Sequence, residues 1–167
     1  MIILGIDPGY AIVGFGVIEK TARETKVIDY GVIETDKSLK MSVRLNKIYD
    51  GLEYLIKKYN PDHFAIEELF YHSNQKTVIN VAMARGVTVL AATKFMGADK
   101  LYEYTPLQIK QALTGNGRAE KQQVQFMVKA ILKLKSIPRP DDAADGLAVA
   151  LCHSQTNLFL SGTDIHW

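Results

Sequence analysis

The sequence is poor in cysteine and in long apolar runs. Its 167 residues include a single cysteine, Cys152, which excludes a disulfide framework and any zinc site built from several cysteines. The apolar runs at 87–92 and 146–152 are far shorter than the roughly 20 residues that span a bilayer. The first residues lack a basic stretch and reach an acid at Asp7, unlike a signal peptide. We therefore expect a soluble, reduced, intracellular protein without a membrane segment.

Phosphate-binding glycine motifs are also missing. No Walker A run is present, and Gly9, Gly14 and Gly16 lie around a predicted strand instead of at a strand-to-helix turn, which excludes a Rossmann fingerprint. Actin-like and sugar-kinase ATPases share the opening Gly-Ile-Asp-x-Gly, but they need two such lobes, for which this chain has no room. The length fits one domain. We expect that domain at 1–160, followed by a short tail at 161–167.

Charge is unevenly distributed along the chain. There are 20 basic and 18 acidic residues in total, yet the segment 107–139 has a balance of +6, with Glu120 as its lone acid. A concentrated basic stretch beside an acidic remainder is typical of a protein that binds a polyanion with one face. A solvated helix face explains the charge alone equally well.

Hydrophobic periodicity predicts an α/β fold. Strands are expected at 1–7, 12–19, 26–35, 63–68 and 101–104, and helices at 41–59, 77–93, from Thr105-Pro106, at 119–134 and from Asp141 or Asp142. Short spacers between the first three strands favour an antiparallel meander. The later crossovers favour a fourth strand parallel to the first and beside it. The prediction is a five-stranded mixed sheet flanked by helices, and small residues on two faces of 77–93 suggest that a second subunit covers one of them.

Acidic residues end the two strands that should be neighbours. Asp7 closes the first strand and Glu67-Glu68 close the fourth, and adjacent strands lie about 4.8 Å apart. The last helix adds a tandem of acids one turn before Asp145, and either member shares a helix face with it. A helix packed beside these strand ends would therefore bring four carboxylates together.

Clustered carboxylates repel one another and are costly to bury unless cations compensate their charge. Mg²⁺ or Mn²⁺ suits such oxygen ligands. Two ions about 4 Å apart can activate a water and stabilise the leaving oxygen of a displacement at phosphorus. Each acid alone has an ordinary explanation as a turn residue, helix cap or solvated strand end. Their convergence predicts metal-dependent phosphodiester hydrolysis.

Three weaker features have two readings each. Phe70-Tyr71 follows the acidic pair and could stack on bases, although Phe70 could equally pack in the core. The turn Gly115–Arg118 could approach a phosphate or simply join two helices. His153, about two turns beyond Asp145, reads better as a hydrogen-bonded core residue than as a ligand.

Six motifs, in order, resemble those of the RuvC-type Holliday junction resolvases. They are Leu4–Gly9, Phe64–Phe70, Ala84–Val87, Tyr104–Gln111, Ala119–Lys121 and Asp141–Ala148. The resemblance extends from residue 1 to about residue 153. It implies a ribonuclease H-like fold and a homodimer that nicks two like strands of a four-way DNA junction symmetrically with Mg²⁺. It also implies a role in bacterial recombination and repair in the cytoplasm, together with the RuvA–RuvB branch-migration proteins.

The resemblance also implies roles for individual residues. The catalytic metal ligands would be Asp7, Glu67, Asp142 and Asp145, with two Mg²⁺ ions per site and Mn²⁺ as a substitute. The motif alignment favours Asp142, but the tandem leaves Asp141 open. The DNA-binding residues that it implies are Phe70, Lys110 and Lys121, and a lysine near the scissile phosphate can offset charge in the transition state. Arg118, from the turn Gly115–Arg118, is a further DNA-binding candidate on the sequence alone. Two other functions stay open, a non-catalytic junction-binding module and a related nuclease acting on RNA.

Overall fold

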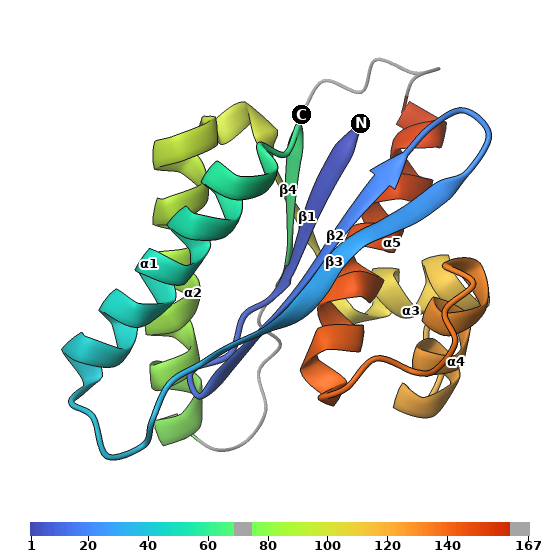
Figure 1. Cartoon of the computed structure of the whole chain (residues 1–167). Helices are drawn as coiled ribbons and strands as arrows, with labels where there is room; N and C mark the ends of the chain where they lie inside the picture. The colour runs from blue at the N-terminus through green and yellow to red at the C-terminus, as the bar shows by residue number, and fades with distance from the viewer. Residues whose placement is uncertain (69–74, 161–167) are drawn as a thin grey trace.

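A five-stranded mixed sheet forms the centre of the protein (Figure 1). The structure is a computed structural model that describes residues 1–68 and 75–160. Its strands are β1 (Ile2–Asp7), β2 (Ile12–Lys20), β3 (Thr25–Glu34), β4 (His63–Glu67) and β5 (Leu101–Tyr104), in the spatial order β3-β2-β1-β4-β5. β2 pairs antiparallel with β1 and β3, and β4 pairs parallel with β1 and β5. The predicted sheet, with the fourth strand beside the first, is confirmed.

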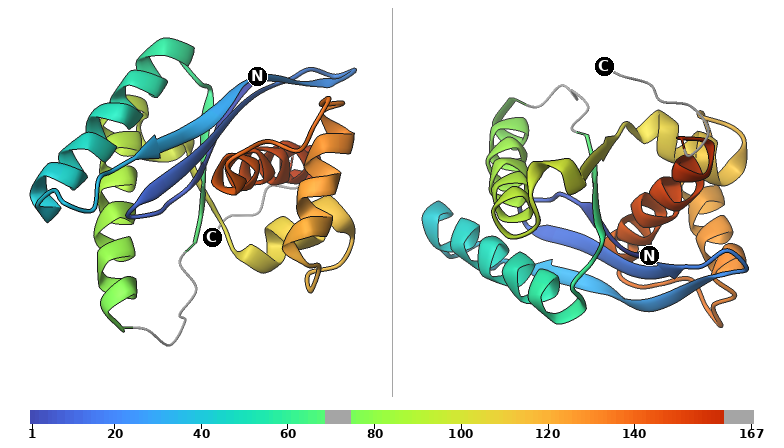
Figure 2. Two further views of the ribbon diagram at one scale, coloured as in Figure 1. Left: turned by 60° about the horizontal axis from the view of Figure 1, so that its bottom comes forward. Right: turned by 90° about the horizontal axis from the view of Figure 1, so that it is seen from above.

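Helices cover both faces of this sheet (Figure 2). They are α1 (Met41–Tyr59), α2 (Gln75–Met96), the 3₁₀ turn η1 (Ala98–Lys100), α3 (Pro106–Thr114), α4 (Lys121–Ile131) and α5 (Asp141–Leu160). α1 and α2 pack together on one face, whereas α5 lies against the other face with α3 and α4 beside it (Figures 1 and 2).

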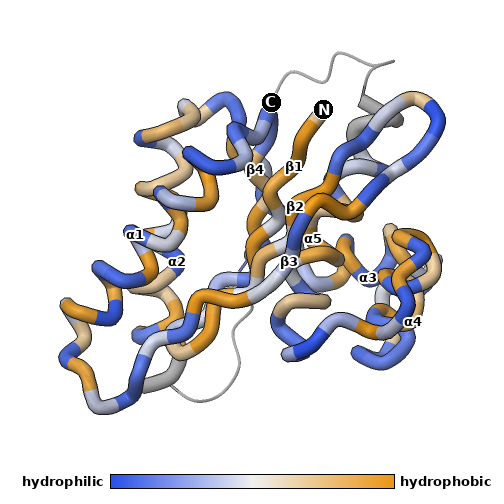
Figure 3. Tube along the Cα trace, in the orientation of Figure 1, coloured by the Kyte–Doolittle hydropathy of each residue, from blue (hydrophilic) through white to orange (hydrophobic). Residues whose placement is uncertain are grey.

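Two hydrophobic cores, one on each face, explain which way the strand side chains point. Ile3 of β1 belongs to the core that contains α5, whereas Leu4 and Ile6 belong to the core that contains α1 and α2. Figure 3 shows β1 and β4 as largely hydrophobic strands between these layers. Because side chains alternate along a strand, Asp7 shares the α5 face with Ile3.

The ends of α3 agree with the sequence, and those of α4 do not. The Thr105 hydroxyl accepts from the Gln108 N–H at 3.2 Å, and the Gln108 side chain accepts from the Thr105 N–H at 2.8 Å, as predicted. α4 covers only Lys121–Ile131 of the predicted 119–134. Glu120 stands outside the helix as its N-cap residue, and the backbone turns left-handed at Lys133, with a φ of 52°.

α2 is more apolar over its whole length than the short uninterrupted apolar runs in the sequence indicate. Val78–Met96 has a mean hydropathy of 1.3 over an 18-residue window and is long enough to cross a membrane by length and composition. Packed helices of globular proteins meet the same two criteria, so this finding does not contradict the expectation of a protein without a membrane segment. Uninterrupted runs missed this apolar helix because Arg85, Thr88 and Thr93 divide the stretch. The helix packs along α1 in this fold.

Candidate active site

The two strand-end acids lie next to each other. β1 and β4 are in parallel register with Ile6 opposite Ile66, so Asp7 and Glu67 follow as neighbours at the carboxyl ends of their strands. Both side chains share the face that α5 covers, because Ala65, two residues before Glu67, lies in the same core as Ile3. The predicted convergence of these two carboxylates is therefore confirmed.

Glycines in the sheet allow the N-terminal part of α5 to approach these acids. A Cβ added to Gly14 would lie 1.9 Å from the Asp142 carbonyl oxygen, and one added to Gly16 would lie 2.6 Å from Leu147 Cα. Gly14 pairs directly with Asp7 across the sheet, so Asp142 sits one strand away from Asp7. The sequence reading used these glycines only to exclude a dinucleotide motif. A glycine inside a strand is also a signal of close backbone approach.

The carboxylates sense one another electrostatically. Burial raises the pKa of Asp7 well above its usual value, and the charges of Glu67, Asp145 and Asp142 raise it further. Burial, followed by the charge of Asp145, raises the pKa of Glu67 to about 7. Burial also raises the pKa of Asp145, although the nearby Lys121 opposes that change. The four acids thus form one cluster whose negative charge is insufficiently compensated.

The two members of the aspartate tandem have different surroundings. Asp141 forms an ion pair with Arg139 at the exposed start of α5. Asp142, and not Asp141, is among the residues whose charge raises the pKa of Asp7. This difference supports the choice of Asp142 as the fourth member of the cluster.

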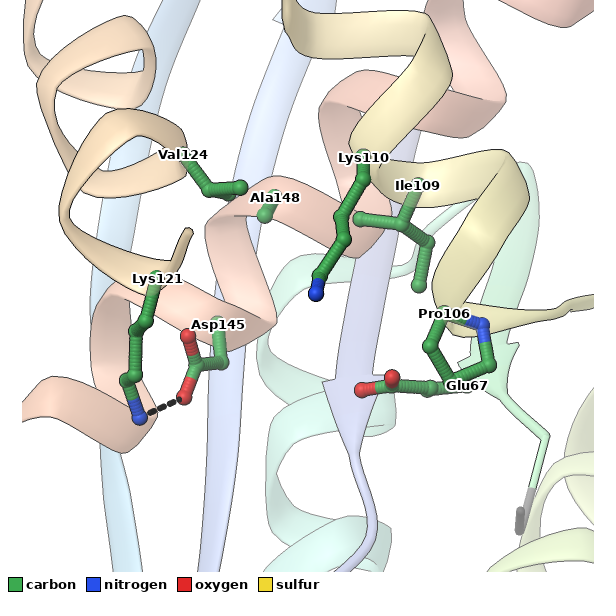
Figure 4. Close-up of a pocket in the computed structure, with 8 residues that line it drawn as sticks. All are labelled: Glu67, Pro106, Ile109, Lys110, Lys121, Val124, Asp145 and Ala148. Atoms are coloured by element: carbon green, nitrogen blue, oxygen red, sulfur yellow. Dashed lines mark hydrogen bonds and ion pairs between the residues drawn. The ribbon is translucent and has the colours of Figure 1, made fainter. Parts of the chain in front are cut away.

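A pocket of about 250 Å³ opens beside the acids (Figure 4). The residues that line it come from β4, α3, α4 and α5. They are Glu67, Pro106, Ile109, Lys110, Lys121, Val124, Asp145 and Ala148. The Lys121 ammonium donates to Asp145 at 2.7 Å. The Lys110 ammonium lies near enough to lower the pKa of Glu67. Both predicted lysines therefore lie within the candidate site.

Lys121 remains positively charged in this setting. Partial burial works against its charged form, but the hydrogen bond to Asp145 and the charges of Asp145, Asp141 and Asp142 outweigh that effect and raise its pKa. The pocket thus combines fixed positive charge with half-buried carboxylates, and one of the lysines is paired directly with Asp145.

The donor set fits a hard divalent cation, because four carboxylates with unfavourable mutual repulsion are the ligands that Mg²⁺ or Mn²⁺ prefers. Within residues 1–68 and 75–160, no three acid, histidine or cysteine side chains stand ready-made around one point. The Asp145 carboxylate is instead turned toward Lys121. Asp7, Glu67, Asp142 and Asp145 are the side chains that could hold such a cation.

The remaining candidates lie elsewhere. Arg118 is exposed in the turn between α3 and α4 and does not line the pocket. Phe70 lies outside the described residues. His153 is fully buried and hydrogen-bonds to His63 at 2.7 Å and to the Tyr104 hydroxyl at 2.6 Å, which confirms the interpretation as a core residue.

The comparison with family models decides the assignment. The model described as "Crossover junction endodeoxyribonuclease RuvC" matches residues 3–153. The chain belongs to the RuvC family. The resemblance carried by the six motifs is confirmed, and with it membership in a family of divalent-metal-dependent DNA endonucleases.

Individual RuvC proteins match over nearly their whole length. The crossover junction endodeoxyribonuclease RuvC of Caldicellulosiruptor saccharolyticus is 56% identical over 154 residues, 92% of this chain and 92% of that protein. That of Clostridioides difficile is 53% identical over 157 residues, 94% of this chain and 92% of that protein. Thermus thermophilus RuvC, solved in complex with a Holliday junction substrate, superposes with a TM-score of 0.85. It is 30% identical, with 95% of this chain and 96% of that chain covered.

Proposed function

We propose that this RuvC protein resolves four-way DNA junctions by nicking two like strands symmetrically, with two Mg²⁺ ions per site and Mn²⁺ as a substitute. The observation that carries the proposal is the cluster of Asp7, Glu67, Asp142 and Asp145, whose charges raise the pKa of Asp7 beside two pocket lysines. The family and the junction-bound Thermus relative support the choice of substrate. The products would be ends that a ligase can seal.

The four carboxylates would hold the cations. When bound, divalent cations supply an activated water and stabilise the leaving oxygen of a phosphodiester. Asp7 and Glu67 project from rigid neighbouring strands, and Asp142 and Asp145 from a helix pressed against them. Such fixed elements keep the ligands in place, so little reorganisation is needed when a phosphate arrives.

The lysines would act on the phosphate itself. Lys110 and Lys121 enter the pocket from α3 and α4, where positive charge can offset the negative charge that develops in the transition state. Arg118, exposed between these helices, would contact the DNA backbone at the rim. Phe70 would stack on a base near the junction centre, as its place in the family motif indicates.

Symmetric nicking needs two active sites, and α2 offers a surface to pair them. Ile79, Met83 and Leu90 lie on one side of α2 and are 59%, 38% and 57% exposed. Gly86, between them, has no atom within 4 Å of the position of a Cβ. We propose that this apolar stripe joins two copies of the chain. A Leu90→Glu variant should then sediment as a monomer and lose paired nicks, whereas a monomeric wild type would contradict the proposal.

The cellular setting follows from the family. We propose that the single domain of residues 1–160 works in the bacterial cytoplasm and receives junctions from the RuvA–RuvB complex. Residues 161–167 would be a tail outside this domain.

The decisive experiment uses a labelled, immobile DNA junction at one fixed salt concentration, because phosphate contacts make binding salt-sensitive. The wild type should cut it with Mg²⁺ and leave it intact with EDTA. Asp7→Asn should bind the junction as the wild type does but lose at least about 1,000-fold in cleavage rate. Asp141→Asn, a matched change one residue before Asp142, should cut at a rate within about threefold of wild type.

Each alternative predicts a different result in the same assay. A junction-binding module would bind the DNA without cutting it at any Mg²⁺ concentration. A nuclease for RNA would cut a four-way RNA junction in preference to the DNA one. Undiminished cleavage by Asp7→Asn would contradict the proposed site while leaving the substrate assignment intact.

A further inference from the structure

Arg44 is a buried cation on the face of the sheet opposite the active-site helix. It belongs to the first turn of α1 and is only 4% exposed. Among the described residues no carboxylate forms an ion pair with it. The Asp36 carboxyl lies near enough for Arg44 to help lower its pKa, but it forms no ion pair with Arg44. Burying a charge without an ion pair is costly, so other neighbours must compensate.

The compensation comes from a fork of contacts to two residues. Arg44 Nε donates to the Thr35 hydroxyl at 2.8 Å, and Nη2 donates to the Tyr10 carbonyl at 3.3 Å. The guanidinium also lies over the Tyr10 ring, 3.5 Å from its centroid. A planar guanidinium can make all three contacts at once, whereas a lysine ammonium cannot.

Both contacts converge on the turn between β1 and β2. The Thr35 hydroxyl donates to the Tyr10 carbonyl at 2.8 Å, and the Thr35 N–H donates to the Ala11 carbonyl at 2.9 Å. At Gly9 a Cβ would lie 1.8 Å from the Ile12 carbonyl oxygen, so the turn is tightly closed. The start of α1 and the end of β3 thus hold residues 8–11 from outside.

This turn begins directly after Asp7. Figure 1 shows the β1–β2 turn at the same end of the molecule as the start of α5. Any rotation of the turn would swing the last residue of β1, and displacements of about 1 Å in a catalytic site can cost about 100-fold in rate. The position of the Asp7 side chain therefore depends on the contacts that fix the turn.

We propose that Arg44 is a positioning residue, which fixes the Pro8–Ala11 turn through its fork to Tyr10 and Thr35 and thereby fixes the carboxylate of Asp7. The inference rests on the proposed function only for the use of that carboxylate. Arg44 does not line the pocket and belongs to neither α3 nor α4, which carry Lys110 and Lys121. It is therefore expected to act on cleavage without acting on DNA binding.

The test compares Arg44→Lys, Arg44→Met and Thr35→Val with a matched control, Thr88→Val. Thr88 is also a buried threonine, and its hydroxyl bonds within α2 to the Ala84 carbonyl at 2.9 Å, far from the turn in sequence. Each variant is measured for thermal unfolding, for junction affinity without metal, and for single-turnover cleavage at a temperature where it is folded.

The fork variants should cleave about 10- to 100-fold more slowly while binding the junction within about threefold of wild type. Arg44→Lys keeps the charge but loses the forked contacts, so its cleavage rate should fall almost as far as that of Arg44→Met. Thr35→Ser should cleave at the wild-type rate, because it keeps the hydroxyl. Thr88→Val should lose stability but not rate.

Two further measurements separate this inference from the proposed function. Hydrogen exchange of the peptide covering residues 8–12 should accelerate in the Arg44 variants and in Thr35→Val, and Mn²⁺ binding by calorimetry should weaken about 10-fold. Neither measurement requires cleavage, so both remain valid if the wild type cuts no junction. Wild-type exchange and wild-type Mn²⁺ affinity in Arg44→Met would overturn the inference, as would an equal loss of rate in Thr88→Val.

Discussion

β4 and α5 carry partly or fully buried polar side chains at two levels, and the two levels are built in opposite ways. Glu67 closes β4 and Asp145 lies near the start of α5, within a cluster of like charges. His63 opens β4 and His153 lies further along α5, in a neutral cluster with Tyr104. The same strand and helix thus carry one cluster of carboxylates that repel one another and one cluster of neutral groups that hydrogen-bond to one another.

The histidine level finds its partners inside the chain. His153 bonds through both ring nitrogens, to His63 and to Tyr104, and the Tyr102 ring lies 4.4 Å from its own. Burial, and then the charge of His63, lowers the pKa of His153 to about 4. The acidic level instead keeps raised pKa values and unmatched charge. Buried groups satisfied internally maintain the fold, whereas buried groups that still need a cation mark the site of chemistry.

Protonation of the histidine level in acid is expected to have the largest effect on stability. His153 is neutral in the folded state down to pH about 4 but protonates near pH 6.5 when unfolded. The unfolded state therefore binds more protons at His153 between those values, so the contribution of this residue to stability should fall by about 3 kcal/mol as the pH drops from 6.5 to 4. Urea unfolding of Glu67→Gln across that range measures the loss, because that variant lacks the opposing titration of Glu67. An NMR titration in which His153 protonates near pH 6.5 would contradict it.

The acidic level works against this trend. Glu67 has a folded pKa of about 7, above its ordinary value of 4.5, so its contribution to stability grows as the pH falls through that window. Glu67→Gln removes this opposing contribution. The variant should therefore lose stability in acid more steeply than the wild type, whereas an unchanged slope would mean that the two levels do not oppose each other.

Binding of a divalent metal should stabilise the folded state through the acidic level and not through the histidine level. At about 100 times its dissociation constant a bound ion stabilises the folded state by about 2.7 kcal/mol. Removing Mg²⁺ with EDTA should lower the unfolding temperature of the wild type at pH 8. The effect should shrink at pH 6, where protons compete for Glu67, and vanish in Asp7→Asn. A metal effect that survives in Asp7→Asn would locate the ion elsewhere.

The smallest effect is expected from the tyrosine. Tyr104→Phe leaves His153 Nδ1 without its hydroxyl partner and should cost about 1–2 kcal/mol of stability, with cleavage within about twofold of wild type. Tyr102→Phe keeps the ring beside His153 and is the matched control. Differential scanning calorimetry and the junction assay give the two readouts. A large loss of cleavage in Tyr104→Phe would show that the levels are coupled.

The acidic level was largely predictable from the sequence, and the histidine level was not. Strand alternation and the rules for parallel crossovers put Asp7 beside Glu67, because both follow from local patterns. His63 and His153 are 90 residues apart, and nothing in either local pattern announces that they meet. Only the burial of His153 in the core could be anticipated.

Choices between adjacent residues also exceeded what the sequence could predict. Asp141 and Asp142 have the same chemistry, and they are distinguished by the ion pair that Arg139 forms with Asp141. The end of α4 depended on a left-handed turn at Lys133, a residue type that rarely adopts it. Side-chain partners and single backbone torsions are set by tertiary context, which periodicity does not contain.

The glycines at the contact between the sheet and α5 have a mechanical consequence. Gly5, Gly16 and Gly146 bring main chain against main chain, with hypothetical Cβ positions 2.4–2.6 Å from opposing backbone atoms. The spacing between strand-borne and helix-borne aspartates is consequently fixed by peptide thickness and cannot be tuned by swapping one core side chain for another. Even a single methyl group at any of these glycines would act as a wedge, lifting the whole helix and pulling half of the ligand set away from the other half.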